Sequence, residues 1–306
     1  MLDILEDREP HEDARFADLR RRGYEAARAG RLDEAEAICI EAIDWAREHG
    51  DERQLELAIC NRAAVTIYQG RGAGELPRLR EILVHNTDPI NCRLAAYNIS
   101  RHYELTKDFK KSLFYARIAL ERAEAIGRRD WVASTQNHIG NVLLAESFVD
   151  EASERYELAL SLMPEEPSVW RARILDNLGY CRVLKGRCPE GYALLYESLS
   201  TLRDFGAELY QVSTLLDLCF AHIETRRYGH ALRRGRAALD LAEKYNQVAD
   251  TKNALYLLGE SSHLSGDAAG ARFYFTRLQR EFFPEAGYLP SFLLTVDIRK
   301  MVNLHA

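Results

Sequence analysis

The sequence predicts an all-α solenoid of about seven stacked helical hairpins. Three observations point to this fold class: a pattern that recurs every 36–41 residues, helical spacing of the apolar residues between recurrences, and only 8 prolines and 18 glycines in 306 residues. So few turn-forming residues argue against an all-β chain. Because 47% of the residues are hydrophobic, we also expect most of the chain to be folded.

The recurring unit is a pair of mostly small residues that lie twelve positions apart. The pairs are Gly23–Ala35, Ala64–Leu76, Ser100–Ser112, Gly140–Ala152, Gly179–Gly191, Cys219–Ala231 and Gly259–Ala271. Two antiparallel helices that cross closely need small side chains where they cross, and a close crossing fixes the length of the turn between them. We therefore expect each unit to be a helical hairpin that buries its apolar faces by stacking on its neighbours.

The second hairpin and the two ends of the chain depart from this pattern. Leu76 takes the second small position of the second hairpin, and its turn, Gly70–Gly74, is loose, so we expect this hairpin to pack differently. Residues 1–15 form an acidic N-terminal segment. Residues 284–306 are expected to form a C-terminal capping helix that covers the last hairpin. The alternative for that helix is a docking site for a partner.

The fourth hairpin resembles the tetratricopeptide repeat (TPR). It carries Gly140, Ala152, Tyr156 and Ala159 at the spacing of the TPR motif, with Pro164 at its closing proline. The resemblance covers residues 16–283, and its period near 40 is similar to the long-helix class found in kinesin light chains and in bacterial peptide- or ligand-sensing regulators. It implies a right-handed superhelical solenoid in which the first helix of each hairpin lines a concave groove.

The resemblance also implies which residues face that groove. Asparagine recurs there, with arginine, tyrosine and one aspartate beside it: Asn61, Tyr97, Asn98, Arg101, Asn137, Asn141, Arg173, Asp176, Asn177, Tyr180 and, in the last repeat, Asn253. An asparagine side chain can pair with both the N–H and the C=O of an extended peptide, whereas arginine suits a carboxylate. The alternative is structural, because the same asparagines could bond to a neighbouring helix.

Enzyme signatures are absent from the sequence: it has no HExxH, P-loop, GxSxG or EF-hand pattern. Its six cysteines are far apart and contain no CxxC pair, which fits buried thiols in a reducing cytoplasm better than disulfides or a zinc site. The histidines are scattered over different repeats. We therefore predict a non-enzyme with no cofactor and no metal.

The charge and hydropathy of the chain exclude some classes of partner. With 41 basic against 47 acidic residues and a net charge of −6, the chain is not expected to bind nucleic acid. The basic run 226–236 is interpreted as a solvated helix face, with RNA or an acidic partner as the alternative. No apolar stretch is long enough to span a membrane. An excess of arginine over lysine suggests a bacterial source.

These features favour a cytoplasmic adaptor or scaffold that binds a peptide or protein segment in the concave groove. The alternative is a ligand- or peptide-sensing regulatory subunit that acts on a separate effector such as a transcription regulator. An enzyme ranks third. The sequence leaves the oligomeric state open.

Overall fold

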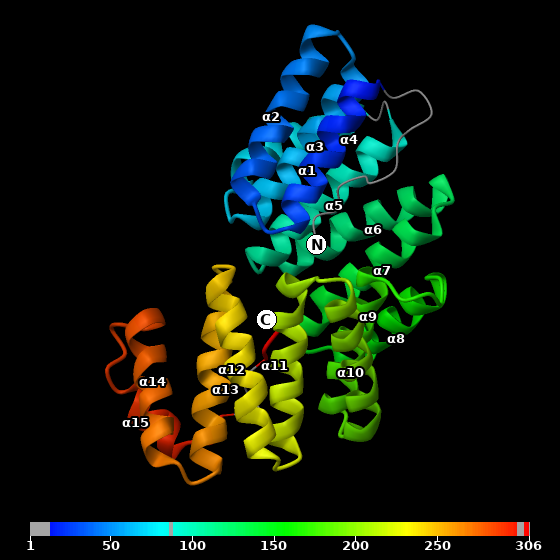
Figure 1. The fold of residues 1–306 in the computed structure, drawn as a ribbon. Helices are drawn as coiled ribbons and strands as arrows, with labels where there is room; N and C mark the ends of the chain where they lie inside the picture. Colours follow the sequence, from blue (N-terminus) through cyan, green and yellow to red (C-terminus); the bar gives the residue numbers. More distant parts are fainter. Residues whose placement is uncertain (1–12, 86–87, 299–302, 306) are drawn as a thin grey trace. The chain divides into compact units, whose positions relative to one another are not determined.

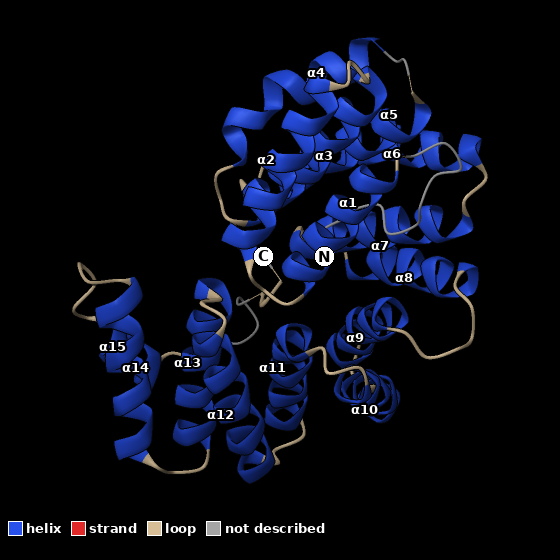
Figure 2. Ribbon diagram, turned by 45° about the horizontal axis from the view of Figure 1, so that its top comes forward, coloured by secondary structure: helices blue, strands red, loops and turns tan. Residues whose placement is uncertain are grey.

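The computed structural model describes residues 13–85, 88–298 and 303–305, and every regular element in these ranges is a helix (Figures 1 and 2). Residues 1–12 of the expected acidic segment lie outside the described residues. The chain divides into two compact units, Met1–Val142 and Leu143–Ala306. The boundary falls inside the helix α7 (Arg129–Ala145).

The helices follow one another in pairs, as the twelve-residue intervals predict. In the first unit they are α1 (Ala14–Arg28), α2 (Leu32–Glu48), α3 (Glu52–Tyr68), the 3-10 turn η1 (Gly72–Glu75), α4 (Leu76–His85), α5 (Pro89–Leu105), α6 (Phe109–Ile126) and most of α7. In the second unit they are α8 (Val149–Leu162), α9 (Val169–Leu184), α10 (Cys188–Asp204), α11 (Glu208–Glu224), α12 (Tyr228–Lys244), α13 (Val248–Leu264), α14 (Ala268–Phe282) and α15 (Leu289–Thr295).

The small-residue pairs lie where the two helices of a hairpin meet. The hydroxyl of Ser100 donates to the carbonyl of Ser112 over 2.7 Å, and the hydroxyl of Ser112 donates to the carbonyl of Ser100 over 2.9 Å. At the crossing of α9 and α10, a methyl group on Gly191 would lie 2.9 Å from the carbonyl oxygen of Gly179. Side chains larger than these would push the helices apart, which confirms the reason given for the pattern.

The second hairpin differs in the way its loose turn predicts. The 3-10 turn η1 precedes α4, which has only 10 residues, whereas its neighbours α3 and α5 have 17 each. Leu79 and Ile82 of α4 are fully buried, so the short helix still closes this part of the core.

First and second helices are buried to different extents within each unit. The first helices α9, α11 and α13 pack against one another in succession, as do α3 and α5. They are buried along most of their length, whereas the second helix α12 is buried along one stripe that includes Ala231, Ala238 and Ala242. Stacked first helices with second helices outside them are what a solenoid requires.

The C-terminal segment is more complex than one closing helix over 284–306. The helix found there, α15, has seven residues and packs on α14, with Leu293 as its buried residue (Figure 1). The described residues 303–305 lie elsewhere, against the first helices of the second unit. Their contacts are central to the candidate site.

Candidate functional site

The predicted groove residues are divided between the two units. Six of them lie in the first unit: Asn61, Tyr97, Asn98, Arg101, Asn137 and Asn141. Five lie in the second unit: Arg173, Asp176, Asn177 and Tyr180 on α9, and Asn253 on α13.

In the first unit, one predicted groove asparagine holds two helices together. The side-chain amide of Asn98 on α5 donates to the carbonyl of Cys60 on α3 over 2.8 Å. Earlier on the same helix, Asn91 donates to the carbonyl of Arg53 over 2.9 Å. Both asparagines are almost wholly buried, and both bonds join successive first helices. For Asn98 this contact matches the structural alternative. Asn61 is also buried, but its side-chain oxygen has no hydrogen-bond partner among the described residues.

A buried arginine lies beside Tyr97. The side chain of Arg93 has no exposed surface, and its guanidinium carbon lies 4.9 Å from the ring centre of Tyr97 and 5.1 Å from that of Trp131. One of its nitrogens lies 3.3 Å from the hydroxyl of Thr135. Aromatic faces attract cations, so the two rings stabilise the charge that burial disfavours.

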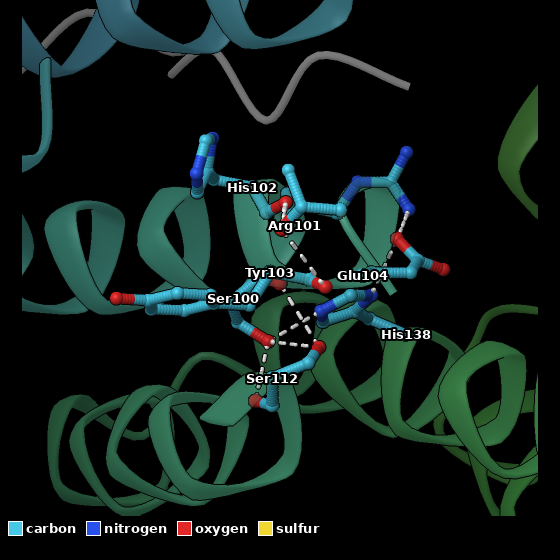
Figure 3. A network of polar contacts seen from close by, with 8 residues as sticks. Ser100, Arg101, His102, Tyr103, Glu104, Ser112 and His138 are labelled. Carbon is cyan, nitrogen blue, oxygen red and sulfur yellow. Dashed lines mark hydrogen bonds and ion pairs between the residues drawn. The ribbon is translucent and has the colours of Figure 1, made fainter. Parts of the chain in front are cut away.

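Next to it, Ser100, His138 and Glu104 form a polar network that resembles a serine–histidine–acid arrangement (Figure 3). The hydroxyl of Ser100 lies 2.6 Å from Nε2 of His138, and Nδ1 of His138 lies 3.7 Å from a carboxylate oxygen of Glu104. Arg101 forms an ion pair with the same carboxylate. Burial, together with nearby arginines, holds the pKa of His138 well below its usual value, so its ring is neutral.

This network is not the active site of a hydrolase. Ser100 has no exposed surface and His138 is 1% exposed, so a substrate cannot reach the hydroxyl. The hydroxyl is also engaged in the crossing with Ser112. What the network does is link α5, α6 and α7 within the first unit, where an unpaired buried hydroxyl or imidazole would cost free energy.

The second unit contains a cluster of three carboxylates, one from each of three stacked first helices, and we call this cluster the pocket. They are Asp176 on α9, Asp217 on α11 and Asp250 on α13. Asp176 and Asp217 are 3% and 1% exposed, whereas Asp250 is half-buried. The hydroxyl of Ser213 donates to one oxygen of Asp176 over 2.9 Å, and the other oxygen has no hydrogen-bond partner among the described residues.

The chain's own residues 303–305 lie across this pocket, with Leu304 and His305 in a turn. Nε2 of His305 is 3.1 and 3.2 Å from the two carboxylate oxygens of Asp217, and its ring centre is 4.4 Å from that of Tyr180. The side-chain amide of Asn253 on α13 donates to the carbonyl of Leu304 over 2.9 Å.

A further contact fixes the segment at its other end. The side-chain amide of Asn303 donates to the carbonyl of Leu144 over 2.8 Å, at the last turn of α7. The last carbonyls of a helix have no partner inside the helix, so they are available to such a donor. The side-chain oxygen of Asn303 accepts a hydrogen bond from the backbone N–H of His305 over 3.0 Å. The three residues thus touch α7, α9, α11 and α13 in turn.

The electrostatics of the pocket favour a cation and disfavour bare carboxylates. Burial raises the pKa of Asp176 to about 7, with the charge of Asp217 adding to the effect. Burial likewise raises the pKa of Asp217 above its usual value, and that of Asp250 to about 6. For His305, burial favours the neutral ring, but the three carboxylates outweigh burial and raise its pKa. The imidazolium and the pocket therefore stabilise each other.

Sequence reasoning missed four residues of this pocket: Asp217, Asp250, Asn303 and His305. Asp217 could have been found, because it lies two residues before Cys219 just as Asn98 precedes Ser100 and Asn177 precedes Gly179. The contact of His305 with Asp217 spans 88 residues and leaves no trace in local periodicity.

Part of the basic run 226–236 packs on tyrosines of α10. The guanidinium of Arg227 lies 5.7 Å from the ring centre of Tyr192, and that of Arg234 lies 5.4 Å from the ring centre of Tyr196. Both tyrosine hydroxyls contact the buried His222, at 2.9 and 3.2 Å. Two arginines of the run are therefore used in packing between α10 and α12.

The cysteines and acidic side chains show no arrangement for metal chemistry. All six thiols are free, and all except the half-buried Cys188 are buried. Burial raises the pKa of Cys39, Cys181 and Cys219 to about 12, so these thiols are inert at neutral pH. In the described part of the chain, no three His, Cys, Asp or Glu side chains are arranged to hold a metal ion.

Comparison with solved structures identifies the fold. A tetratricopeptide repeat protein from Parabacteroides merdae is 15% identical, with a TM-score of 0.53 over 91% of this chain and 97% of that one. The chain has a TPR-like fold. PilW, a type IV pilus biogenesis factor, is 20% identical, with a TM-score of 0.58 over 78% of this chain and 99% of PilW.

A third similar structure is that of a complex. It is a Rap protein complexed with the competence and sporulation factor, 14% identical, with a TM-score of 0.71 over 87% of this chain and 76% of the Rap protein. No protein-family model and no curated protein sequence matches the chain. None of the described helices has the length and apolar character needed to cross a membrane.

Proposed function

We propose that this TPR-like chain is a non-catalytic adaptor that binds an extended peptide or protein segment along the inner faces of its first helices. One observation carries the proposal: the side-chain amide of Asn253 on α13 holds the backbone carbonyl of Leu304, while His305 contacts Asp217 on α11. A side chain that holds one backbone carbonyl can hold that of another peptide, because backbone C=O groups do not depend on sequence.

The remaining groove residues are assigned roles in the same proposal. Arg173 is held between two rings, with its guanidinium carbon 5.6 Å from the ring centre of Trp170 and 5.3 Å from that of Tyr210. A guanidinium fixed in this way suits an acidic side chain or a peptide carboxylate. Asn177 on α9 supplies a further polar group to the second unit. In the first unit we assign peptide contacts to Asn61, Tyr97, Arg101, Asn137 and Asn141.

A second candidate function is a peptide-sensing regulatory subunit that acts on a separate effector. The similarity to a Rap protein complexed with the competence and sporulation factor favours it. A sensor gains thermal stability from its ligand by mass action, by about 2.7 kcal/mol at a hundred times the dissociation constant. An adaptor instead co-purifies with a protein. The six free thiols suit a reducing compartment, and we place the protein in the bacterial cytoplasm.

The test is quantitative capture of partners by the tagged full chain from its native lysate, beside three single variants. Arg173→Ala and Asn253→Ala change the inner face of the second unit, and Arg236→Ala changes an exposed residue of the outer helix α12. Groove binding predicts a stoichiometric partner that both inner-face variants lose and Arg236→Ala retains. A partner that only Arg236→Ala loses would move the interface to the outer helices and refute the proposal.

A further inference from the structure

The pocket of the second unit has the properties of a site for a positively charged group. Three carboxylates from α9, α11 and α13 act electrostatically on His305. Those of Asp176 and Asp217 are buried, and one oxygen of Asp176 has no hydrogen-bond partner among the described residues. Burying carboxylates is costly unless a cation pairs with them. Tyr180 adds an aromatic face beside the carboxylates, and aromatic faces also favour cations.

Residues 303–305 occupy this site in the manner of a bound peptide. His305 supplies the cation, Asn253 holds the carbonyl of Leu304, and Asn303 caps the last turn of α7. Among the described residues, no backbone–backbone hydrogen bond joins residues 303–305 to a helix. Side chains make the hydrogen bonds that join these residues to the first helices.

We propose that Asn303, Leu304 and His305 are an internal ligand of a site whose external ligand is a peptide carrying an arginine or lysine side chain, which must displace them. The inference rests on the proposed function and specifies it for the second unit. A tethered segment acts at an effective concentration in the millimolar range, so it competes with any peptide that binds from solution.

A histidine side chain suits an internal ligand that an external peptide has to displace from the pocket. The groups that face its ring are Asp176 and Tyr180 on α9, Asp217 on α11 and Asp250 on α13. As pH rises through the raised pKa of His305, the imidazolium loses its charge, while Asp176 and Asp250 ionise around pH 7 and 6. The pocket thus becomes more negative as its internal cation is lost. Arginine and lysine keep their positive charge over this pH range, so a peptide that carries one of them competes better with His305 as the pH rises.

The experiment measures binding of two labelled hexapeptides by fluorescence anisotropy at pH 6 and pH 9. One has the sequence of residues 301–306, Met-Val-Asn-Leu-His-Ala, and the other carries the change His305→Arg. The proteins are the full chain and the full chain with Asn303→Ala and His305→Ala together, which weakens the internal ligand and leaves the pocket intact. Asp217→Asn and Asn253→Ala in that double variant serve as pocket controls.

The double variant should bind the hexapeptide about tenfold more tightly than the full chain at pH 6, given a dissociation constant near 100 µM and a millimolar internal competitor. Asp217→Asn should weaken binding by about a hundredfold, as expected when one member of a buried charge pair is removed. Asn253→Ala gives an independent reading if the aspartate variant does not fold. From pH 6 to pH 9 the histidine peptide should lose affinity and the arginine peptide should retain it.

Equal binding to the full chain and the double variant would overturn the proposal. So would a double variant that binds neither peptide at millimolar concentration, or identical pH profiles for the two peptides. These failures are distinguishable from failure of the proposed function. Residues 303–305 would then be a structural element of the second unit, while partner capture that depends on Arg173, outside the pocket, would still stand.

Discussion

A methyl group added at the crossing of α9 and α10 tests the physical basis of the whole repeat pattern. In Gly191→Ala the new carbon would lie 2.6 Å from a methyl of Val183 and 2.9 Å from the carbonyl oxygen of Gly179. The side chain of Val183 can rotate, but the carbonyl is part of the α9 backbone and can move only with the helix. Overpacking of this kind costs about 1–3 kcal/mol, and the better helix propensity of alanine returns at most about 1 kcal/mol.

We therefore expect Gly191→Ala to destabilise the second unit by about 1–2 kcal/mol, equivalent to a fall in melting temperature of roughly 3–6 °C. The assay is thermal and urea unfolding followed by far-UV circular dichroism. Gly229→Ala is the matched control, because Gly229 also lies in the first turn of an outer helix but has nothing within 4 Å of where the added methyl would lie. It should be neutral or slightly stabilising. If both variants behave alike, the close crossing does not explain the twelve-residue interval.

Three further predictions concern buried polar groups and thiols. Asn98→Ala should lower the stability of the first unit by about 1–2 kcal/mol, because its bond to the Cys60 carbonyl is lost; unchanged stability with weaker partner binding would contradict the structural role. His138 is neutral when folded but takes up a proton when unfolded, so acidification below its usual pKa should destabilise the wild type by up to about 1.4 kcal/mol per pH unit, a dependence that His138→Gln should reduce. A pH profile identical in wild type and variant would refute this. A thiol reagent should modify the half-buried Cys188 first in the native chain, and Cys188→Ser should remove that fast phase.

The repeat architecture could be predicted from sequence because its cause is local. Each close crossing needs small residues at two fixed positions, as the Ser100–Ser112 and Gly179–Gly191 contacts illustrate. The division into two units could not be predicted, because it falls at Val142 within α7, in the most regular of the repeats, with no break in composition.

The candidate site was predicted only where it follows repeat positions. Tyr180 and Asp176 were identified from their place on a first helix, and both lie in the pocket. Asp217 was overlooked, although it occupies the position that Asn98 and Asn177 hold in other repeats. His305 belongs to no repeat, and a segment without periodicity carries no sequence signal for the surface that receives it.

The place of His305 also bears on how this protein should be handled in the laboratory. It directly precedes position 306, so an affinity tag fused there would begin beside a pocket that already accepts an imidazole. A polyhistidine tag would offer several more imidazoles at high local concentration. Binding measured on such a fusion would report competition with the tag. An N-terminal tag, or one removed before measurement, leaves the pocket with its natural occupant.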